Sequence, residues 1–274
     1  MPPNQTTESS SRYNDLEKKS VAELIIGINN EDATIAAVVK QSLPQIEKLV
    51  TAVVEKMKAG GRLFYIGAGT SGRLGILDAS EIPPTYGVHD KVIGLIAGGD
   101  TAIRKAVEDA EDNLQQAWKD LKQYNISSND FLIGIAASGT TPYVLGGLQM
   151  AKQNKVSTGC IVCNEGSVIA ATAQYKIELL TGPEFVTGST RMKAGTAQKM
   201  VLNMISTAAM IQLGKVQGNK MVEMQLSNNK LRRRAVNMLM QELKVNERAA
   251  IDLIKEYKTV KRAIKAFHEK NKAQ

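Results

Sequence analysis

The sequence is poor in the residues that commonly carry nucleophilic, metal-assisted or redox chemistry. Its 274 residues include only 2 histidines and 2 cysteines. His89 and His268 stand far apart and no H-x-x-x-H spacing occurs, so neither a Ser/His/Asp or Cys/His team nor a metal site is indicated. Any acid or base in a reaction must therefore be a carboxylate, a lysine or a tyrosine.

The two cysteines, Cys160 and Cys163, form a C-x-x-C within an apolar run. A redox pair of this type begins a helix, whereas this run predicts a buried strand, in which positions 160 and 163 point to opposite faces. We expect two buried thiols without redox chemistry.

Long apolar segments are also absent. No run approaches the ~20 residues of a transmembrane helix, and the first twenty residues are polar with mixed charge, which predicts neither membrane insertion nor a secretory signal. We therefore expect a cytoplasmic protein. With 43% hydrophobic and 23% charged residues, the composition is that of a globular chain, long enough for one large domain and a small appendage.

The net charge of +8 raises the question of nucleic-acid binding. Residues 228–274 hold 13 Lys and Arg against 5 Asp and Glu, so this segment accounts for the whole surplus. A basic helical segment with few aromatic residues is more often a solvated face or a subunit contact, and we expect no nucleic-acid partner.

The start of the chain predicts an arm followed by helices. Residues 1–20 lack periodicity and predict a mobile arm or a segment ordered only on assembly. Asn30 is a candidate cap for a helix over 31–41, and Pro44 suits the first turn of a second helix that ends at Gly60. We expect three parts: an N-terminal arm with helices over 1–50, a central domain over 51–216 and a C-terminal helical segment over 217–274.

From residue 62 to residue 180 short apolar runs alternate with helical patterns. This order predicts an α/β fold with a five-stranded parallel sheet between helices, whose ligands bind at the carboxyl ends of the strands. The expected strands are 62–66, 92–97, 131–136, 158–163 and 175–180, and the expected helices are 71–79, 102–122, 142–153 and 167–173. A further helix is expected over about 190–214, and two or three amphipathic helices follow residue 228.

The stretch after the first strand combines a Gly/Ser/Thr turn with the start of a helix. Thr70 and Ser71 offer hydroxyl groups beside the free N–H groups of a helix N-terminus, which favours a phosphate. A well-capped helix start is the alternative. The G-x-G-x-x-G spacing of Gly67, Gly69 and Gly72 matches the dinucleotide-binding fingerprint. However, hydroxyl side chains fill this turn, and the acidic residue of the fingerprint, here Asp100, comes about thirty residues on rather than about twenty. The match to the fingerprint therefore fails. No P-loop sequence occurs.

A second turn of the same kind follows the strand at 131–136. Ser138, Gly139, Thr140 and Thr141 offer further hydroxyl and backbone donors, and Pro142 fits the first helical position. Two such turns on one sheet edge predict a phosphosugar or a similar phosphate ligand, because several donors can converge on its oxygens.

Carboxylates near these turns are the candidate acids and bases. Glu81 follows the first helix beside Ile82, Pro83 and Pro84, which could desolvate it and favour its protonated form, although it could also be a surface residue. If 102–122 is one helix, Glu108 and Glu111 share a face while Asp109 and Asp112 turn away. The spacing leaves the choice between these two glutamates open.

Three long blocks carry a resemblance to a known family. The sequence resembles the N-acetylmuramic acid 6-phosphate etherases of the sugar isomerase (SIS) superfamily from about residue 20 to about residue 240, through GAGTSGRLGILDASEIPPTYGV, IAASGTTPYV and TGSTRMKAGTAQKMVLNM. The region after about residue 240 is shorter and more basic than expected of the family. Ile82 stands at a position where members of the family often have a cysteine, directly after the catalytic acid.

The resemblance implies a SIS fold and a homodimer with sites near the subunit interface. The implied reaction is an elimination that cleaves the D-lactyl ether at C3, followed by hydration to N-acetylglucosamine 6-phosphate and D-lactate, without a metal or an organic cofactor. The family's acid falls on Glu81 and its second catalytic glutamate on Glu111. The phosphate would lie among the residues of the two turns: Thr70, Ser71, Ser138, Gly139, Thr140 and Thr141.

Two cations of the third block, Arg191 and Lys193, are candidates for substrate contacts, with helix capping or a subunit contact as the alternative. Two other functions remain open for this sequence. A non-catalytic sugar-phosphate sensor needs both turns but neither glutamate, and an aldose–ketose isomerase needs a base at C2 but no acid at a C3 leaving group.

Overall fold

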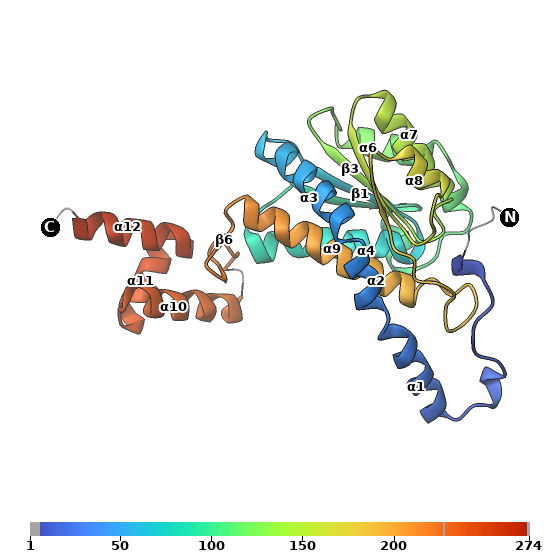
Figure 1. Ribbon diagram of the computed structural model, residues 1–274. Helices are drawn as coiled ribbons and strands as arrows, with labels where there is room; N and C mark the ends of the chain where they lie inside the picture. The colour runs from blue at the N-terminus through green and yellow to red at the C-terminus, as the bar shows by residue number, and fades with distance from the viewer. Residues whose placement is uncertain (1–5, 227, 273–274) are drawn as a thin grey trace. The chain divides into compact units, whose positions relative to one another are not determined.

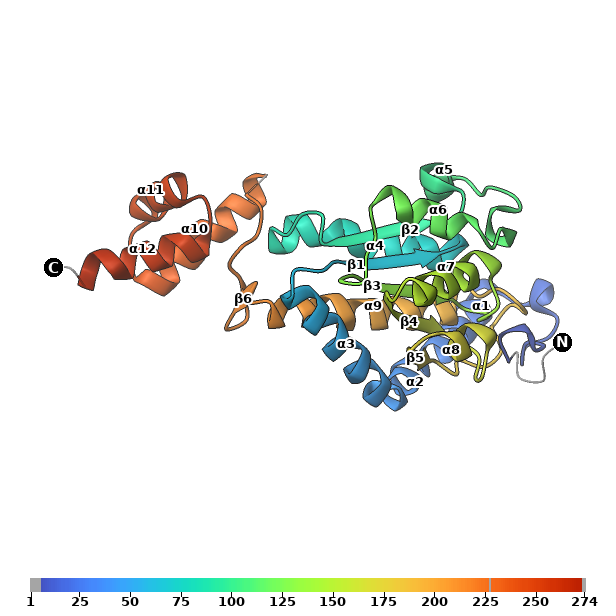
Figure 2. The same ribbon diagram turned by 90° about the horizontal axis from the view of Figure 1, so that it is seen from above.

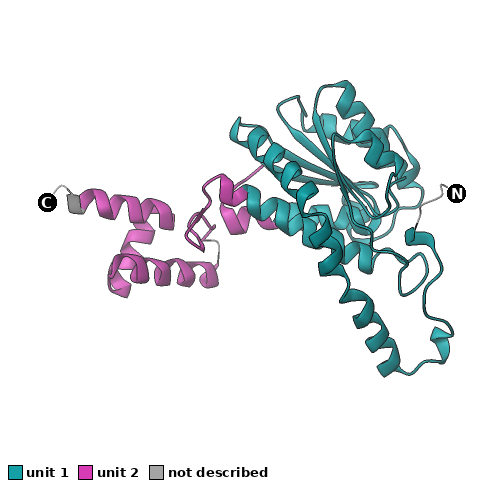
Figure 3. Ribbon diagram, in the orientation of Figure 1, with its two compact units in different colours: residues 1–80, 91–209 teal, residues 81–90, 210–274 magenta. Residues whose placement is uncertain are grey.

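The computed structural model describes residues 6–226 and 228–272, which form two compact units (Figure 3). Unit 1 comprises the chain up to Ser80 together with Lys91–Ala209, and unit 2 comprises Glu81–Asp90 and Met210–Gln274. Helices α4 (Gly69–Tyr86) and α9 (Lys193–Gln212) each begin in unit 1 and end in unit 2.

A five-stranded parallel sheet forms the centre of unit 1, in the order β2-β1-β3-β4-β5 (Figures 1 and 2). All residues of the two central strands are buried, as is typical of a parallel sheet with helices on both faces. The expected sheet is confirmed, and each strand overlaps its expected range: β1 (Leu63–Gly67), β2 (Val92–Ile96), β3 (Phe131–Ala136), β4 (Ser157–Val162) and β5 (Tyr175–Glu178).

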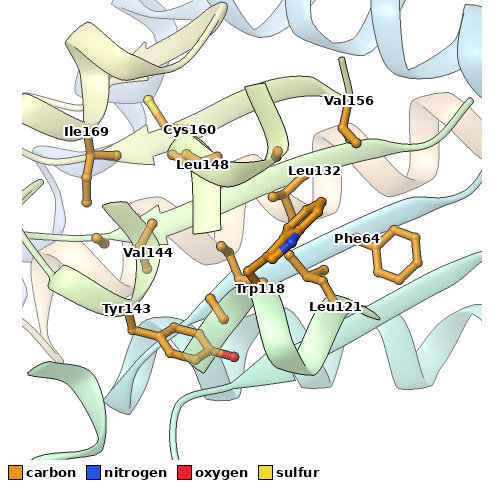
Figure 4. Close-up of a cluster of buried hydrophobic side chains, with 14 of the residues drawn as sticks. Phe64, Trp118, Leu121, Leu132, Tyr143, Val144, Leu148, Val156, Cys160 and Ile169 are labelled. Atoms are coloured by element: carbon orange, nitrogen blue, oxygen red, sulfur yellow. The ribbon is translucent and has the colours of Figure 1, made fainter. Parts of the chain in front are cut away.

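Helices α6 (Gln116–Gln123), α7 (Pro142–Gln153) and α8 (Val168–Thr172) cover one face of the sheet (Figure 1). Alternate strand residues such as Phe64, Leu132 and Cys160 point to this face. Figure 4 shows them packed with Trp118 and Leu148 of the covering helices. This cluster fixes α7 on β3 and therefore fixes the turn that joins them.

Helices α3 (Leu43–Lys58), α4 and α9 lie on the opposite face. A buried polar contact joins three of these elements: Tyr65 Oη donates to Asp78 Oδ2 (3.1 Å) and Ser206 Oγ donates to Asp78 Oδ1 (3.0 Å). Burial raises the pKa of the Asp78 carboxyl, although hydrogen bonds from Ser206 and Tyr65 oppose this shift. The contact holds α4 between β1 and α9.

The N-terminal helices begin earlier than the sequence predicted. Helix α1 (Val21–Asp32) starts at a capping box in which Ser20 and Glu23 bond each other's backbone N–H groups. Asn30 therefore lies inside α1, and its predicted role as a cap was wrong. Helix α2 (Ile35–Gln41) follows, and α3 has Pro44 in its first turn as expected.

The single helix predicted over 102–122 was also wrong. The chain forms α5 (Gly99–Arg104), a 3-10 turn η3 (Ala110–Asp112) and then α6. Lys105 is extended and Asp109 is left-handed with φ 57°. Four carboxylates within five residues repel one another at helical spacing, which disfavours a continuous helix here: Glu108, Asp109, Glu111 and Asp112.

Unit 2 contains the C-terminal helices α10 (Asn229–Leu243), α11 (Glu247–Tyr257) and α12 (Val260–Lys272), which confirms the expected amphipathic helices. Their apolar faces form one core around Leu239, Ala250 and Ala263. Within the same unit a short hairpin joins β6 (Val216–Gln217) to β7 (Lys220–Met221). Gln225 N donates to Pro84 O (3.2 Å), which ties the segment after this hairpin to the end of α4.

An ion pair closes the sheet at the amino ends of β1 and β3. The side chain of Asp130 is 3% exposed and accepts from the Arg62 guanidinium (3.1 and 2.9 Å), from Arg62 N (2.9 Å) and from Ser127 N (2.8 Å). Burial alone would raise the pKa of Asp130, but these hydrogen bonds and the Arg62 charge lower it overall.

We expect Asp130→Asn to lower the free energy of unfolding at pH 7 by about 1–3 kcal/mol, because charge-assisted hydrogen bonds are lost. The pKa of Asp130 is lower in the folded state, so its contribution is present above the ordinary carboxyl pKa of ~3.9 and is lost as the pH falls through the folded value. Urea unfolding should therefore show wild type and variant converging below about pH 4.

Asp15→Asn is the control, because the Asp15 side chain is 63% exposed and pairs with Lys18 at the surface. Its effect should stay within about 0.5 kcal/mol. A gap between wild type and Asp130→Asn that widens as the pH falls would contradict the assignment.

Candidate active site

The chain changes direction between β1 and β3, which are neighbours at the centre of the sheet. From β1 it passes through α4 to β2 on one side, and from β3 it passes through α7 to β4 on the other. Such a reversal opens a crevice at the carboxyl ends of the two strands, which is where open α/β sheets bind ligands. Both Gly/Ser/Thr turns lie at this crevice.

The first turn brings the end of β1 against the start of α4. A Cβ on Gly67 would lie 2.7 Å from Gly72 N, so only glycine permits this approach. Helix α4 then begins at Gly69, and its first N–H groups have no partners within the helix. Ser71 is buried and donates through Oγ to Gln198 Oε1 of α9 (2.9 Å), which fixes its rotamer.

The second turn joins β3 to α7. Ser138 Oγ accepts from Thr140 N (3.2 Å) and from Thr140 Oγ1 (3.1 Å), so the hydroxyl groups gather at one point. Gly139 has φ +73°, and a Cβ there would lie 2.3 Å from Ser167 Oγ. Pro142 occupies the first turn of α7, as expected.

A cavity of about 360 Å³ lies between the two turns. All five hydroxyl-bearing residues predicted to bind the phosphosugar line it, namely Thr70, Ser71, Ser138, Thr140 and Thr141. Gly139 is absent from the lining and shapes the turn instead. The N-termini of α4 and α7 both add positive potential, so the cavity is suited to an anion with several acceptor oxygens.

Glu111 lines this cavity and Glu108 does not. The helical face that grouped the two glutamates does not exist, because Glu111 lies in the 3-10 turn η3 that follows the left-handed Asp109. Asp112, which a helix would have turned away, lines the cavity as well. The cavity therefore distinguishes Glu111 from Glu108, which the sequence spacing could not do.

Glu81 is exposed and lies near the carboxyl end of α4, a helix longer than the expected 71–79. The helix continues through Pro83 and Pro84 and ends where Gly87 N donates to Pro83 O (2.9 Å). Thr70 belongs to unit 1, whereas Glu81 belongs to unit 2. Glu81 is not among the residues that line the cavity.

The two cations of the third block have different environments. Lys193 is 2% exposed, and its Nζ donates to Glu31 Oε2 of α1 (2.5 Å). Glu184 accepts from Lys193 N and Ala194 N (both 2.9 Å) and so caps α9. Arg191 is exposed. Neither cation lines the cavity, and the Lys193 side chain is used in an ion pair within the chain.

Three of the lining residues with polar side chains were not predicted as site residues: Glu8, Asp112 and Thr190. Thr190 belongs to the block that contains Arg191, and its hydroxyl group is the signal in the sequence that marks it as a candidate. Glu8 lies in the N-terminal segment, where no local pattern marks a ligand-binding residue. Only contacts between distant parts of the chain bring it to the cavity.

Both cysteines are buried free thiols, as predicted. Burial raises the pKa of Cys160 to about 12 and also raises that of Cys163. Within residues 6–226 and 228–272, no group of three or more His, Cys, Asp or Glu side chains is arranged to hold a metal ion. In the same described residues, no helix has the length and apolarity needed to cross a membrane.

Comparison with known proteins identifies the family. The chain is 60% identical over 267 residues to an N-acetylmuramic acid 6-phosphate etherase of Christiangramia forsetii, an alignment that covers 97% of each chain. The chain belongs to the N-acetylmuramic acid 6-phosphate etherase family. A relative of the same name from Bacteroides thetaiotaomicron is 56% identical over 98% of this chain and 97% of its own length.

The chain matches nearly the whole length of these two relatives. A longer etherase, from a Geobacillus species, is 51% identical over 89% of this chain and 83% of its own length. Family models for the glucokinase regulatory protein N-terminal SIS domain and for the SIS domain match residues 45–152 and 106–208.

Solved structures confirm the SIS fold. A phosphoheptose isomerase from Francisella tularensis has a TM-score of 0.52 at 17% identity, and the match covers 72% of this chain and 100% of that one. The protein c3406 of E. coli CFT073 has a TM-score of 0.53 at 17% identity, and the match covers 73% of this chain and 96% of that one.

We expect Gly139→Ala to weaken the binding of inorganic phosphate by at least about 10-fold, because a Cβ at this position displaces Ser167 and distorts the second turn. Gly166→Ala is a matched control: Gly166 also has positive φ, at +63°, but a Cβ there meets nothing within 4 Å. Isothermal titration calorimetry should show near wild-type phosphate affinity for the control. Equal losses in both variants would assign the effect to backbone strain alone.

Proposed function

We propose that this chain cleaves the D-lactyl ether of N-acetylmuramic acid 6-phosphate, a carbon–oxygen lyase reaction that gives N-acetylglucosamine 6-phosphate and D-lactate. Its relatives at 50–60% identity bear the name of this activity. The observation that carries the proposal is a single cavity that holds both hydroxyl-rich turns together with Glu111.

The phosphate group lies at the two turns in this proposal. Thr70, Ser138 and Thr141 donate hydroxyl hydrogen bonds, and the N–H groups at the starts of α4 and α7 add further donors. Ser71 and Thr140 line the same site, but their hydroxyl groups already donate to Gln198 and Ser138. The open-chain sugar extends from the phosphate toward η3. Its own C1 aldehyde makes the C2 proton acidic, so no cofactor is part of the proposal.

Glu111 is the proposed base. It takes the proton from C2, and the C1 carbonyl accepts the resulting negative charge. The C3–O bond then breaks when an acid protonates the departing lactate oxygen, and water adds to C3 of the unsaturated sugar.

Glu81 is the proposed acid, although it does not line the cavity that holds both turns and Glu111. We assign the acid to a second copy of the chain in a homodimer, whose Glu81 completes the site.

An exposed apolar face supports assembly. Val21, Ile25 and Ile26 of α1 are 72%, 61% and 60% exposed, and α1 extends away from the sheet (Figure 1). Residues 21 and 25 share one face of the helix, so α1 offers an apolar surface that water disfavours. The cytoplasmic location also stays part of the proposal, since both cysteines are free thiols, as is usual in a reducing compartment.

Purified protein with N-acetylmuramic acid 6-phosphate should release D-lactate, and Glu111→Gln should reduce kcat by at least about 100-fold, because a positioned base contributes about 10²–10⁴-fold. Glu108→Gln is the matched control, since Glu108 is also exposed but lies outside the cavity, and it should keep near wild-type kcat. A folded wild-type protein that releases no lactate would favour the sugar-phosphate sensor.

Glu81→Gln and Glu111→Gln should each be inactive in lactate release, yet a hybrid dimer of the two should recover about half of the wild-type activity. One of its two sites then combines an intact Glu111 with an intact Glu81 from the other copy. Hybrids can be isolated with two affinity tags and assayed for D-lactate. Inactive hybrids would place both glutamates on one chain.

Exchange of the C2 proton with solvent distinguishes the base from the acid. Glu81→Gln should retain some exchange of the C2 proton with solvent deuterium, because the base is intact, whereas Glu111→Gln should lose it. Equal exchange in the two variants would overturn the assignment of acid and base.

A further inference from the structure

The N-terminal segment supplies a carboxylate to the candidate active site. Glu8 lies at the end of the 3-10 turn η1 (Thr6–Glu8), more than 50 residues before the first Gly/Ser/Thr turn, and it lines the cavity with Thr70, Ser138 and Glu111. All of these residues belong to unit 1. None of the roles proposed above uses Glu8.

A buried amide holds this segment beside the second turn. Asn164, which follows β4, is 2% exposed, and its Oδ1 accepts from Thr6 Oγ1 and Thr7 N (both 3.2 Å). Its Nδ2 donates to Thr7 Oγ1 (2.8 Å) and to Ser138 O (3.1 Å). Thr7 is fully buried. The residue next to Glu8 is therefore tied through one side chain to the backbone of the phosphate-binding turn.

The other side of Glu8 faces the loop before α9. A Cβ on Gly188 would lie 3.3 Å from Glu8 Oε2, so the carboxylate sits closely against this loop. Thr190 of the same loop lines the cavity, and its backbone N donates to Gly188 O (2.9 Å). Glu8 is thus placed by Asn164 on one side and by residues 188–190 on the other.

The charge of Glu8 determines what it can bind. A carboxylate accepts hydrogen bonds and repels a phosphate dianion, so Glu8 is unsuited to the phosphate itself. A sugar presents hydroxyl groups, and an amino sugar adds an amide N–H, all of which are donors. Within residues 6–226 and 228–272 no hydrogen bond or ion pair of the Glu8 carboxylate is found, so both of its oxygens can accept from a ligand.

We propose that Glu8 is a substrate-binding residue that accepts hydrogen bonds from the hydroxyl or amide N–H groups of the amino sugar. The inference rests on the proposed function for the identity of that sugar. Glu8 thereby distinguishes a sugar phosphate from simpler phosphates, which the two turns alone bind equally well.

The test compares two ligands on Glu8→Gln. Affinity for N-acetylglucosamine 6-phosphate should fall by about 10-fold or more, as expected for a hydrogen bond to a charged group, while affinity for inorganic phosphate stays the same or rises. Glu8→Ala, which removes both oxygens, should lose at least as much. Glu17→Gln is the control, because Glu17 is exposed, carries the same charge in the same segment and lies outside the cavity.

Isothermal titration calorimetry gives both affinities without turnover, and steady-state lactate release should show a raised KM with a smaller change in kcat. Unchanged sugar-phosphate affinity in Glu8→Gln would overturn the proposal, and so would an equal loss for both ligands, which would indicate a damaged turn. A wild-type protein that binds the sugar phosphate but releases no lactate refutes only the etherase reaction. A wild type that binds no amino-sugar phosphate refutes both.

Discussion

The site depends on one topological constraint, the reversal of the chain between β1 and β3. Because α4 and α7 leave adjacent strands in opposite directions, their N-termini meet at one crevice. Each terminus carries roughly half a positive charge and several unpaired N–H groups. A bound phosphate dianion would match this potential, and Gly67 and Gly139 allow the backbones to form the crevice.

The sheet and both turns could be predicted because their signals are local. A short apolar run followed by Gly, Ser and Thr specifies a strand and the turn after it within about ten residues. The predicted helix over 102–122 does not form as one element, because adjacent carboxylates repel one another at helical spacing and outweigh its apolar periodicity. Because this repulsion breaks the helix, Glu111 lies in the 3-10 turn η3 and lines the cavity. A regular helical face would not have distinguished it from Glu108.

The contact between the N-terminal segment and the cavity could not be predicted, because it depends on residues about 157 positions apart. Asn164 is buried, so leaving its amide without partners would cost about 1–3 kcal/mol. Thr6, Thr7 and the carbonyl of Ser138 supply those partners. The segment and the second turn therefore stabilise each other, although residues 1–20 showed only the composition of an arm and residues 1–5 lie outside the described residues.

Helix α4 imposes the remaining constraint on the proposed mechanism. Its first turn belongs to the proposed phosphate site in unit 1, while Glu81 belongs to unit 2 and does not line the cavity. One continuous sequence block contains both features and suggested one site. In the proposed dimer the same block serves two sites, because each α4 holds the phosphate of one substrate and presents its acid to another. Ether cleavage then requires assembly, whereas phosphate binding does not.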